Sequence, residues 1–246
     1  MAGHSKWKQI KHKKALTDSR RAATWTKIIR EITVAARAGG GDPAGNPRLR
    51  LAMDTARGAN MPNENIERAI KKGTGELEGV NYEEITYEAY GPGGVAIMID
   101  SLTDNPNRTV ADIRHALSRN GGNLGTTGSV AWMFDRRGQI TVDSSRYDEA
   151  TVMEAALEAG ALDMEVEEDG YTIISDPVEF HAVQEGLRAA GIEWESADLA
   201  MVPKSTVKVE EDAGKLLKLL DALEDLDDVQ KVYTNADIDE ESLAAA

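Results

Sequence analysis

The chain of 246 residues contains no cysteine, only seven prolines and few aromatic residues, which make up 5% of the sequence. The absence of cysteine excludes disulfides, thiolate metal sites and cysteine nucleophiles, and it is typical of a reducing compartment. No hydrophobic run approaches the roughly 20 residues that a membrane-spanning helix needs. The residues that follow Met1 are basic and polar and do not resemble a secretory leader. We therefore expect a cytoplasmic protein that has no contact with a membrane.

The charge of the chain is divided very unevenly between its two parts. The formal net charge is −15, yet residues 1–73 carry 16 Lys and Arg against 6 Asp and Glu. Residues 74–246 carry 12 against 37 and are strongly acidic. Because charges on a separate domain are largely screened beyond about 8 Å at physiological salt, the local excess of positive charge decides what the N-terminal part attracts. That excess is typical of a part that binds nucleic acid.

Three helices are predicted in the basic part. The first spans about residues 17–38 and ends at three glycines, the second opens at Asn46-Pro47, and the third runs from Pro62-Asn63 to Gly73. Small and apolar residues recur in the first helix at spacings of three and four: Ala22, Trp25, Ile29, Ile32 and Ala36. The basic residues Arg20, Lys27, Arg30 and Arg37 fall on another side of it. The predicted core is thin, so we expect this domain to be mobile relative to the rest.

Beyond residue 80 the hydrophobic period changes from helical to two. Strands are predicted at Ile85–Tyr90, Val95–Asp100 and Ser129–Phe134, with a helix at 105–120. A β-α-β-β-α-β order follows, which is the split βαβ arrangement of ferredoxin-like domains: strand 139–143, helix 149–159, strands 163–167 and 171–175, helix 177–190 and strand 193–201. A final strand, helix and strand at 205–209, 212–226 and 229–234 have no partner layer of their own. We place them back against residues 80–134.

The predicted fold class is therefore α+β and multidomain. An N-terminal three-helix domain precedes two α/β ferredoxin-like domains, the third inserted in the second. The predicted boundaries are 1–77 for the helical domain, 78–134 plus 204–238 for the second, and 135–203 for the third, with a frayed tail at 239–246.

The strongest local motif is basic and contains an aromatic residue. Lys6-Trp7-Lys8 continues to Lys11-His12-Lys13-Lys14, so ammonium groups could neutralise phosphates while an indole stacks on a base. Alternatively, the basic run is a solvated tail and Trp7 packs against the rest of the domain. For some of the arginines the alternative is an ion pair within a helix. The predicted nucleic-acid-binding residues are Lys6, Trp7, Lys8, Lys11, His12, Lys13, Lys14, Arg20, Arg21, Lys27, Arg30, Arg37, Arg48, Arg50, Arg57 and Arg68.

No motif predicts catalysis, a metal or a cofactor. The glycine-rich stretch at 121–128 matches neither dinucleotide nor P-loop spacing, and it precedes a strand instead of opening a helix. The four histidines lack metal-ligand spacing, and no nucleophile with a base stands out. We therefore expect a protein that is not an enzyme.

The order of several short motifs is similar to that of the YebC/PmpR family. These motifs are Gly3-His4-Ser5-Lys6-Trp7, Lys13-Lys14, Asp18-x-x-Arg21, Ile29-Arg30-Glu31-Ile32, Gly39-Gly40-x-Asp42-Pro43, Asn60-Met61-Pro62, Ile66-x-Arg68-Ala69-Ile70, Tyr90-Gly91-Pro92-Gly93-Gly94, Thr103-Asp104-Asn105 and Gly125-x-x-Gly128-Ser129-Val130. The resemblance covers nearly the whole chain. It implies an N-terminal helical bundle followed by two α/β domains, in a probable transcriptional regulator that binds DNA.

Three functions stay open from the sequence. The leading hypothesis is a regulator of gene expression that binds DNA through the helical domain. Mitochondrial relatives resemble translational activators, so a ribosome-associated factor that contacts rRNA is the first alternative, and a protein-interaction scaffold is the second. The expected partner is nucleic acid, with the ribosome as a further candidate, and the expected oligomeric state is a monomer or weak dimer.

Overall fold

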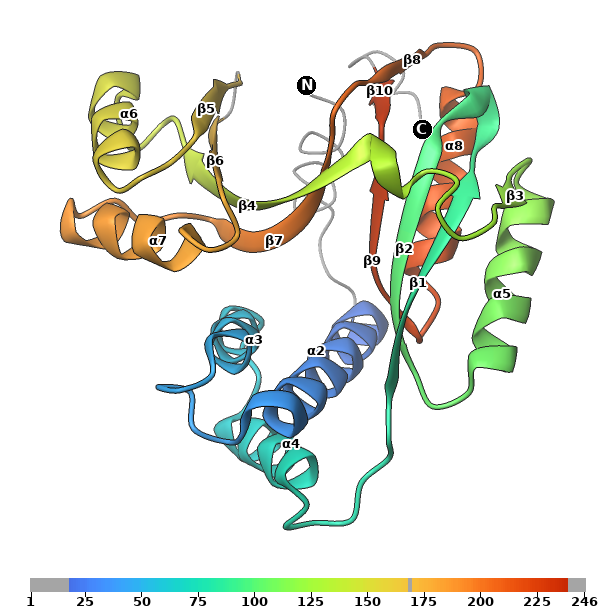
Figure 1. Cartoon of the computed structure of the whole chain (residues 1–246), viewed down its shortest axis with the longest axis horizontal. Helices are drawn as coiled ribbons and strands as arrows, with labels where there is room; N and C mark the ends of the chain where they lie inside the picture. The colour runs from blue at the N-terminus through green and yellow to red at the C-terminus, as the bar shows by residue number, and fades with distance from the viewer. Residues whose placement is uncertain (1–17, 168–169, 239–246) are drawn as a thin grey trace.

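The computed structural model describes residues 18–167 and 170–238, and its helical part forms one end of the molecule (Figure 1). The basic segment before residue 18 and the tail expected at 239–246 lie outside the described residues. The helices are α2 (Asp18–Gly39), α3 (Pro47–Gly58) and α4 (Asn63–Thr74). Ile32 of α2, Leu49 of α3 and Ile66 of α4 are buried together, and Trp25 packs against them as predicted.

Two local devices fix how these helices pack. The buried Asn46 side chain accepts a hydrogen bond from the Leu49 N–H at the start of α3 and donates to the carbonyl oxygens of Ala35 and Gly40. Gly73 lets α4 approach α2 closely, because a Cβ at this position would lie only 2.4 Å from the Thr33 carbonyl oxygen. The three helices therefore depend on a few specific contacts as well as on a small apolar core.

The first sheet has the strand order β3-β1-β2-β9 and is covered on one face by two helices (Figure 1). Its elements are β1 (Glu83–Tyr90), η1 (Pro92–Gly94), β2 (Ala96–Thr103), α5 (Pro106–Arg119), β3 (Asn123–Leu124), α8 (Ala213–Glu224) and β9 (Val229–Thr234). A small parallel pair, β8 (Val207–Val209) and β10 (Ala236–Ile238), lies beside it. Apolar residues of α5, α8 and the strands form the largest core of the molecule, with Ile99, Leu117 and Leu216 completely buried.

The second sheet has the strand order β5-β6-β4-β7. Its elements are η2 (Ala131–Met133), β4 (Phe134–Asp143), α6 (Glu149–Glu158), β5 (Asp163–Val166), β6 (Gly170–Ser175), α7 (Phe180–Ala189) and β7 (Ser196–Pro203). All of its neighbouring strands are antiparallel. Both the element order and the strand order are those of the ferredoxin-like split βαβ arrangement.

The two sheets share a small core where β4 begins and β7 ends. Phe134 and Ala200 of the second sheet are buried against Ala96, Met98 and Tyr233 of the first. The long β4–β7 ribbon thus leaves the first sheet and returns to it (Figure 1), since Phe134 pairs with Pro203 at the junction. This is the topology of one α/β unit inserted into another, and the multidomain α+β class is confirmed.

Three details differ from the sequence-based expectation. Residues 129–133 are not part of a strand, because the N–H groups of Val130 and Ala131 bind the Glu88 carboxylate instead of a neighbouring strand. The short strands β3 and β10 were not predicted. The centre of the first sheet is the hairpin β1–β2, so its connectivity departs from the ferredoxin-like order that the second sheet has.

Candidate nucleic-acid interface

The basic N-terminal run, which carries the strongest sequence motif, lies outside the described residues. This applies to seven predicted contacts: Lys6, Trp7, Lys8, Lys11, His12, Lys13 and Lys14. Arg20 and Arg21 lie in the first turn of α2, which places them directly after that run. The predicted contacts at these positions stay predictions.

The basic side of α2 faces the acidic body of the protein. Lys27 donates to the carbonyl oxygen of Glu224 at 2.5 Å, and Arg37 donates to the carbonyl oxygen of Val80 at 3.2 Å. Between them, Arg30 is only 13% exposed and its guanidinium forms an ion pair of 2.7 Å with Asp228. These three side chains attach the helical domain to the first sheet, a role that their shared helix side did not reveal.

Asp228 is the centre of this attachment. Its side chain is 6% exposed and accepts hydrogen bonds from Arg30, Arg108 and the Thr109 hydroxyl, each at 2.7 Å in its closest contact. Burial favours a higher pKa for Asp228, but the bonds from Thr109, Arg108 and Arg30 outweigh it and hold the pKa below its ordinary value. Arg30 also donates to the carbonyl oxygens of Leu102 and Asp227 and lies over the Tyr82 ring. These bonds restrain the helical domain, which the thin apolar core alone would not do.

Arg48 makes a second connection between the helical domain and the first sheet. Its guanidinium binds Glu31 of α2 and Glu84 of β1, with closest distances of 2.7 Å to each carboxylate. Both carboxylates are bound through two oxygens, which is the geometry that a planar guanidinium favours. The positive charge of Arg48 is therefore already compensated by two carboxylates of the protein itself.

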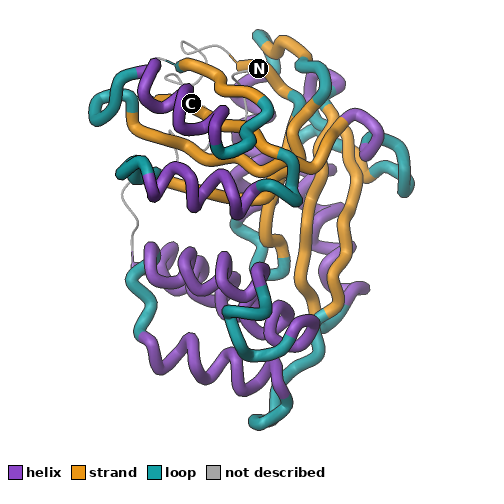
Figure 2. The backbone as a smooth tube through the Cα atoms, turned by 60° about the vertical axis from the view of Figure 1, so that its left-hand side comes forward, coloured by secondary structure: helices purple, strands orange, loops and turns teal. Residues whose placement is uncertain are grey.

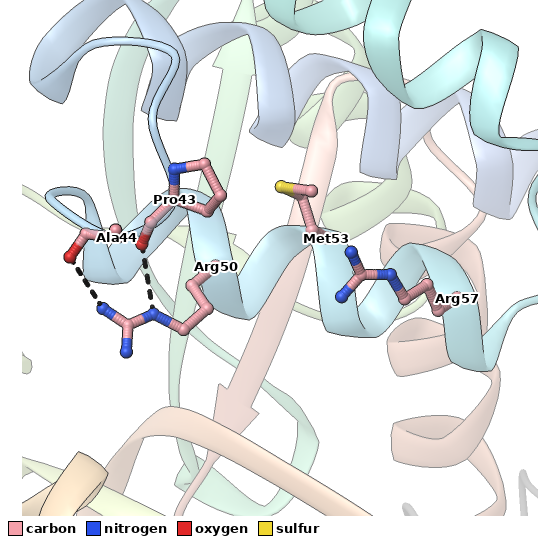
Figure 3. Close-up of a pocket in the computed structure, with 5 residues that line it drawn as sticks. All are labelled: Pro43, Ala44, Arg50, Met53 and Arg57. Carbon is pink, nitrogen blue, oxygen red and sulfur yellow. Dashed lines mark hydrogen bonds between the residues drawn. The ribbon is translucent and has the colours of Figure 1, made fainter.

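Arg50 and Arg57 lie on one side of α3 around a shallow pocket with Pro43, Ala44 and Met53 (Figure 3). Arg50 points back to the loop before α3 and donates to the carbonyl oxygens of Pro43 and Ala44. Its remaining nitrogen lies 2.9 Å from His181 Nε2 of α7, so Arg50 also reaches the second sheet's domain. Arg57 extends back along the helix toward Met53 (Figure 3), and among the described residues its ion pair is with Asp54, one turn earlier.

Exposed positive charge continues on α4. In the part of the chain that the structure describes, the ion pair of Arg68 is with Glu64, one turn before it on the same helix. Lys71 is exposed and Lys72 half-buried, in the last turn. Neither lysine was singled out from the sequence, because basic residues in a last turn are also what the helix dipole favours. Exposed pairs within one helix are worth only about 0.5 kcal/mol, so Arg57 and Arg68 can exchange their carboxylates for a phosphate at little cost.

Seven of these cations fall into two groups with different surroundings. Lys27, Arg30, Arg37 and Arg48 contact the second domain, which accounts for their positions without a ligand. Arg57, Arg68 and Lys71 are exposed, and we call them the outer cations; in the chain they follow the basic run at 6–21. Among the described residues no group of three or more His, Asp or Glu is placed to hold a metal ion. No helix within the described ranges is long and apolar enough to cross a membrane.

Comparisons with known proteins agree along the whole length. Residues 5–76 match the TACO1/YebC protein N-terminal domain, and residues 82–236 match the TACO1/YebC second and third domain. A "probable transcriptional regulatory protein" of Gemmatimonas aurantiaca is 61% identical over 100% of both chains. One of the same description from Persephonella marina is 57% identical over 98% of both. A crystal structure of a conserved hypothetical protein from Aquifex aeolicus is 49% identical, with a TM-score of 0.84 over 91% of this chain and 93% of that one. The chain belongs to the TACO1/YebC family.

Proposed function

We propose that this protein is a regulator of gene expression that binds DNA through its helical domain. The contacts are the basic run at 6–21 and the outer cations Arg57, Arg68 and Lys71. The observation that carries the proposal is the division of the cations. Lys27, Arg30 and Arg37 of α2 bind the body, whereas the outer cations meet no carboxylate of another domain among the described residues. The names of the relatives support the regulatory role.

The outer surface suits contacts with phosphates better than the reading of bases. On α4 the exposed Glu64 and Glu67 lie beside Arg68. If α4 entered a groove of duplex DNA, these carboxylates would come close to the phosphates and base edges. Phosphate contacts position a protein without selecting a sequence. The same surface therefore fits duplex RNA, which is recognised largely by shape. This observation favours a ribosome-associated factor that contacts rRNA as the second candidate, ahead of a scaffold that binds acidic proteins.

A charge-reversal variant tests the proposal. Replacing Arg57, Arg68 and Lys71 by glutamate should weaken binding to duplex DNA and to an rRNA fragment. It should also lower the slope of log affinity against log salt by about 0.9 for each DNA phosphate that the variant no longer neutralises. The matched control reverses three exposed cations of the second domain, Arg114, Lys208 and Lys215, and changes the net charge equally.

The two variants separate local binding from overall charge. Equal weakening in both would show that only the net charge matters, and unchanged binding in the α3–α4 variant would refute the proposed surface. Crosslinking in cells, followed by sequencing of the bound nucleic acid, then distinguishes the two candidates. Reads at promoters support DNA binding, and reads in rRNA or stalled messages support the ribosome.

A further inference from the structure

A buried carboxylate organises the glycine-rich loop that leads into η2. Glu88 of β1 is 6% exposed, and its two oxygens accept hydrogen bonds from the N–H groups of Gly128, Val130 and Ala131 at 2.6, 2.6 and 2.8 Å. The Gly125 N–H also donates to the Glu88 carbonyl oxygen at 2.7 Å. Gly128 has a φ of +84°, which only glycine adopts readily. The loop is therefore held firmly against the end of β1.

This loop fixes two aromatic rings by a shared acceptor. The Tyr90 hydroxyl and the Trp132 indole N–H both donate to the Ser129 carbonyl oxygen, each at 3.1 Å. Because the polar atom of each ring is already bound, what remains exposed is apolar ring surface. Tyr90 is 39% exposed and Trp132 is 68% exposed. We call these two residues the aromatic platform.

The exposure of Trp132 is unusual for this chain. The other tryptophans that the structure describes, Trp25 and Trp194, are packed against hydrophobic cores. Beside the platform, the exposed Lys204 donates to the Trp132 carbonyl oxygen at 3.0 Å, and its ammonium lies 3.4 Å from Asp135. A rigid aromatic face next to an ammonium group is the combination with which proteins stack unpaired bases and hold the adjoining phosphate.

We propose that the aromatic platform stacks an unpaired nucleobase of the nucleic acid that the helical domain holds. This inference rests on the proposed function and adds a second binding point to it. A nucleobase suits the platform because the exposed surface is aromatic ring and the Lys204 ammonium lies beside it.

The position of the platform predicts the shape of the ligand. Tyr90 ends β1, whereas Glu84 near its start pairs with Arg48 of the helical domain (Figure 1). Six residues of β-strand separate these two points by about 20 Å. The platform therefore lies at the far end of β1 from the contact between this strand and the helical domain. The ligand is a duplex with an unpaired extension or loop, not a blunt duplex.

A tailed hairpin tests the platform with the full chain. The probes are an RNA hairpin with a stem of about ten base pairs and the same hairpin with an unpaired tail of about six nucleotides, long enough to offer the platform several bases. The tail should raise the affinity of the wild type between about 5-fold and about 150-fold, the range for stacking of one base on an aromatic ring. Trp132→Leu should abolish this gain, while Trp132→Phe should retain most of it. Both variants should fold normally, because the side chain is mostly exposed.

The outcomes separate the platform from the proposed function. If the tail gives no gain in the wild type, or if Trp132→Leu keeps the gain, the platform is refuted while stem binding still supports the function. If neither hairpin nor a DNA duplex binds at low salt, both proposals fail. Greater quenching of tryptophan fluorescence by the tailed probe than by the untailed one, seen in the wild type and in Trp194→Phe but not in Trp132→Phe, would identify Trp132 as the residue on which the tail stacks.

Discussion

The sequence and the structure assign different roles to Arg30, and its ion pair with Asp228 allows the two roles to be tested. From the sequence Arg30 is a phosphate contact, whereas in the structure it is nearly buried against Asp228. Removing one partner of a buried pair costs about 3–5 kcal/mol, because the other charge loses its compensation. Asp228→Ala should approach that range, since it also deprives Thr109 of its acceptor. Arg108 adds less, because it is half exposed and keeps Asp104.

Arg30→Met should cost less, about 2 kcal/mol, because Asp228 keeps its bonds from Arg108 and Thr109. Urea unfolding followed by circular dichroism measures both effects. The double variant Arg30→Met with Asp228→Ala should be less destabilised than the sum of the single variants, by about 1–3 kcal/mol. Nucleic-acid affinity per folded molecule should be unchanged in Arg30→Met. A variant of full stability with weakened affinity would refute this reasoning and return Arg30 to the nucleic-acid-binding surface.

Two further predictions concern single buried polar groups. Burial favours a higher pKa for Glu88, but the N–H groups of Val130, Gly128 and Ala131 outweigh it and lower the pKa, so the carboxylate stabilises the fold above its unfolded pKa. That contribution is lost as pH falls through the pKa that Glu88 has in the folded protein. The free energy of unfolding of Glu88→Gln, measured by urea titration at several acidic pH values, should therefore depend less on pH than that of the wild type. An equal pH dependence would contradict the assignment. Asn46→Ala should destabilise the protein by about 2 kcal/mol or more, because the α3 cap and two buried carbonyl bonds are removed. Asn46→Asp keeps the hydrogen bond that caps α3 but cannot donate to the two carbonyl oxygens, so its melting temperature should not exceed that of the wild type. A higher melting temperature would show that the bonds to the carbonyl oxygens contribute nothing.

Local pattern predicted most of the secondary structure. The helix that opens at Asn46-Pro47 and the helix at 105–120 are encoded by neighbouring residues, and the structure has them where the sequence placed them. The error at residues 129–133 has a non-local cause. Val130 looks like a strand residue, but its N–H binds the carboxylate of Glu88, 42 residues earlier. Patterns of period two carry no information about such a distant acceptor.

The candidate site was less predictable for the same reason. Helical spacing showed that Lys27, Arg30 and Arg37 share one side of α2, but not what that side meets. Arg30 and Asp228 are 198 residues apart, so no local signal could pair them. The sequence indicated a basic domain on an acidic body. Figure 2 shows that the helices lie beside that body. The ion pairs of Arg30 with Asp228 and of Arg48 with Glu84 hold the two parts together.

Titration of affinity against salt tests the central claim most directly. Binding of the full chain to a duplex should weaken linearly on logarithmic axes as salt rises. The slope should be shallower when Arg57, Arg68 and Lys71 are reversed and unaltered when Arg30 becomes methionine. A slope near zero in the wild type, or one that Arg30→Met changes and the outer cations do not, would contradict the account.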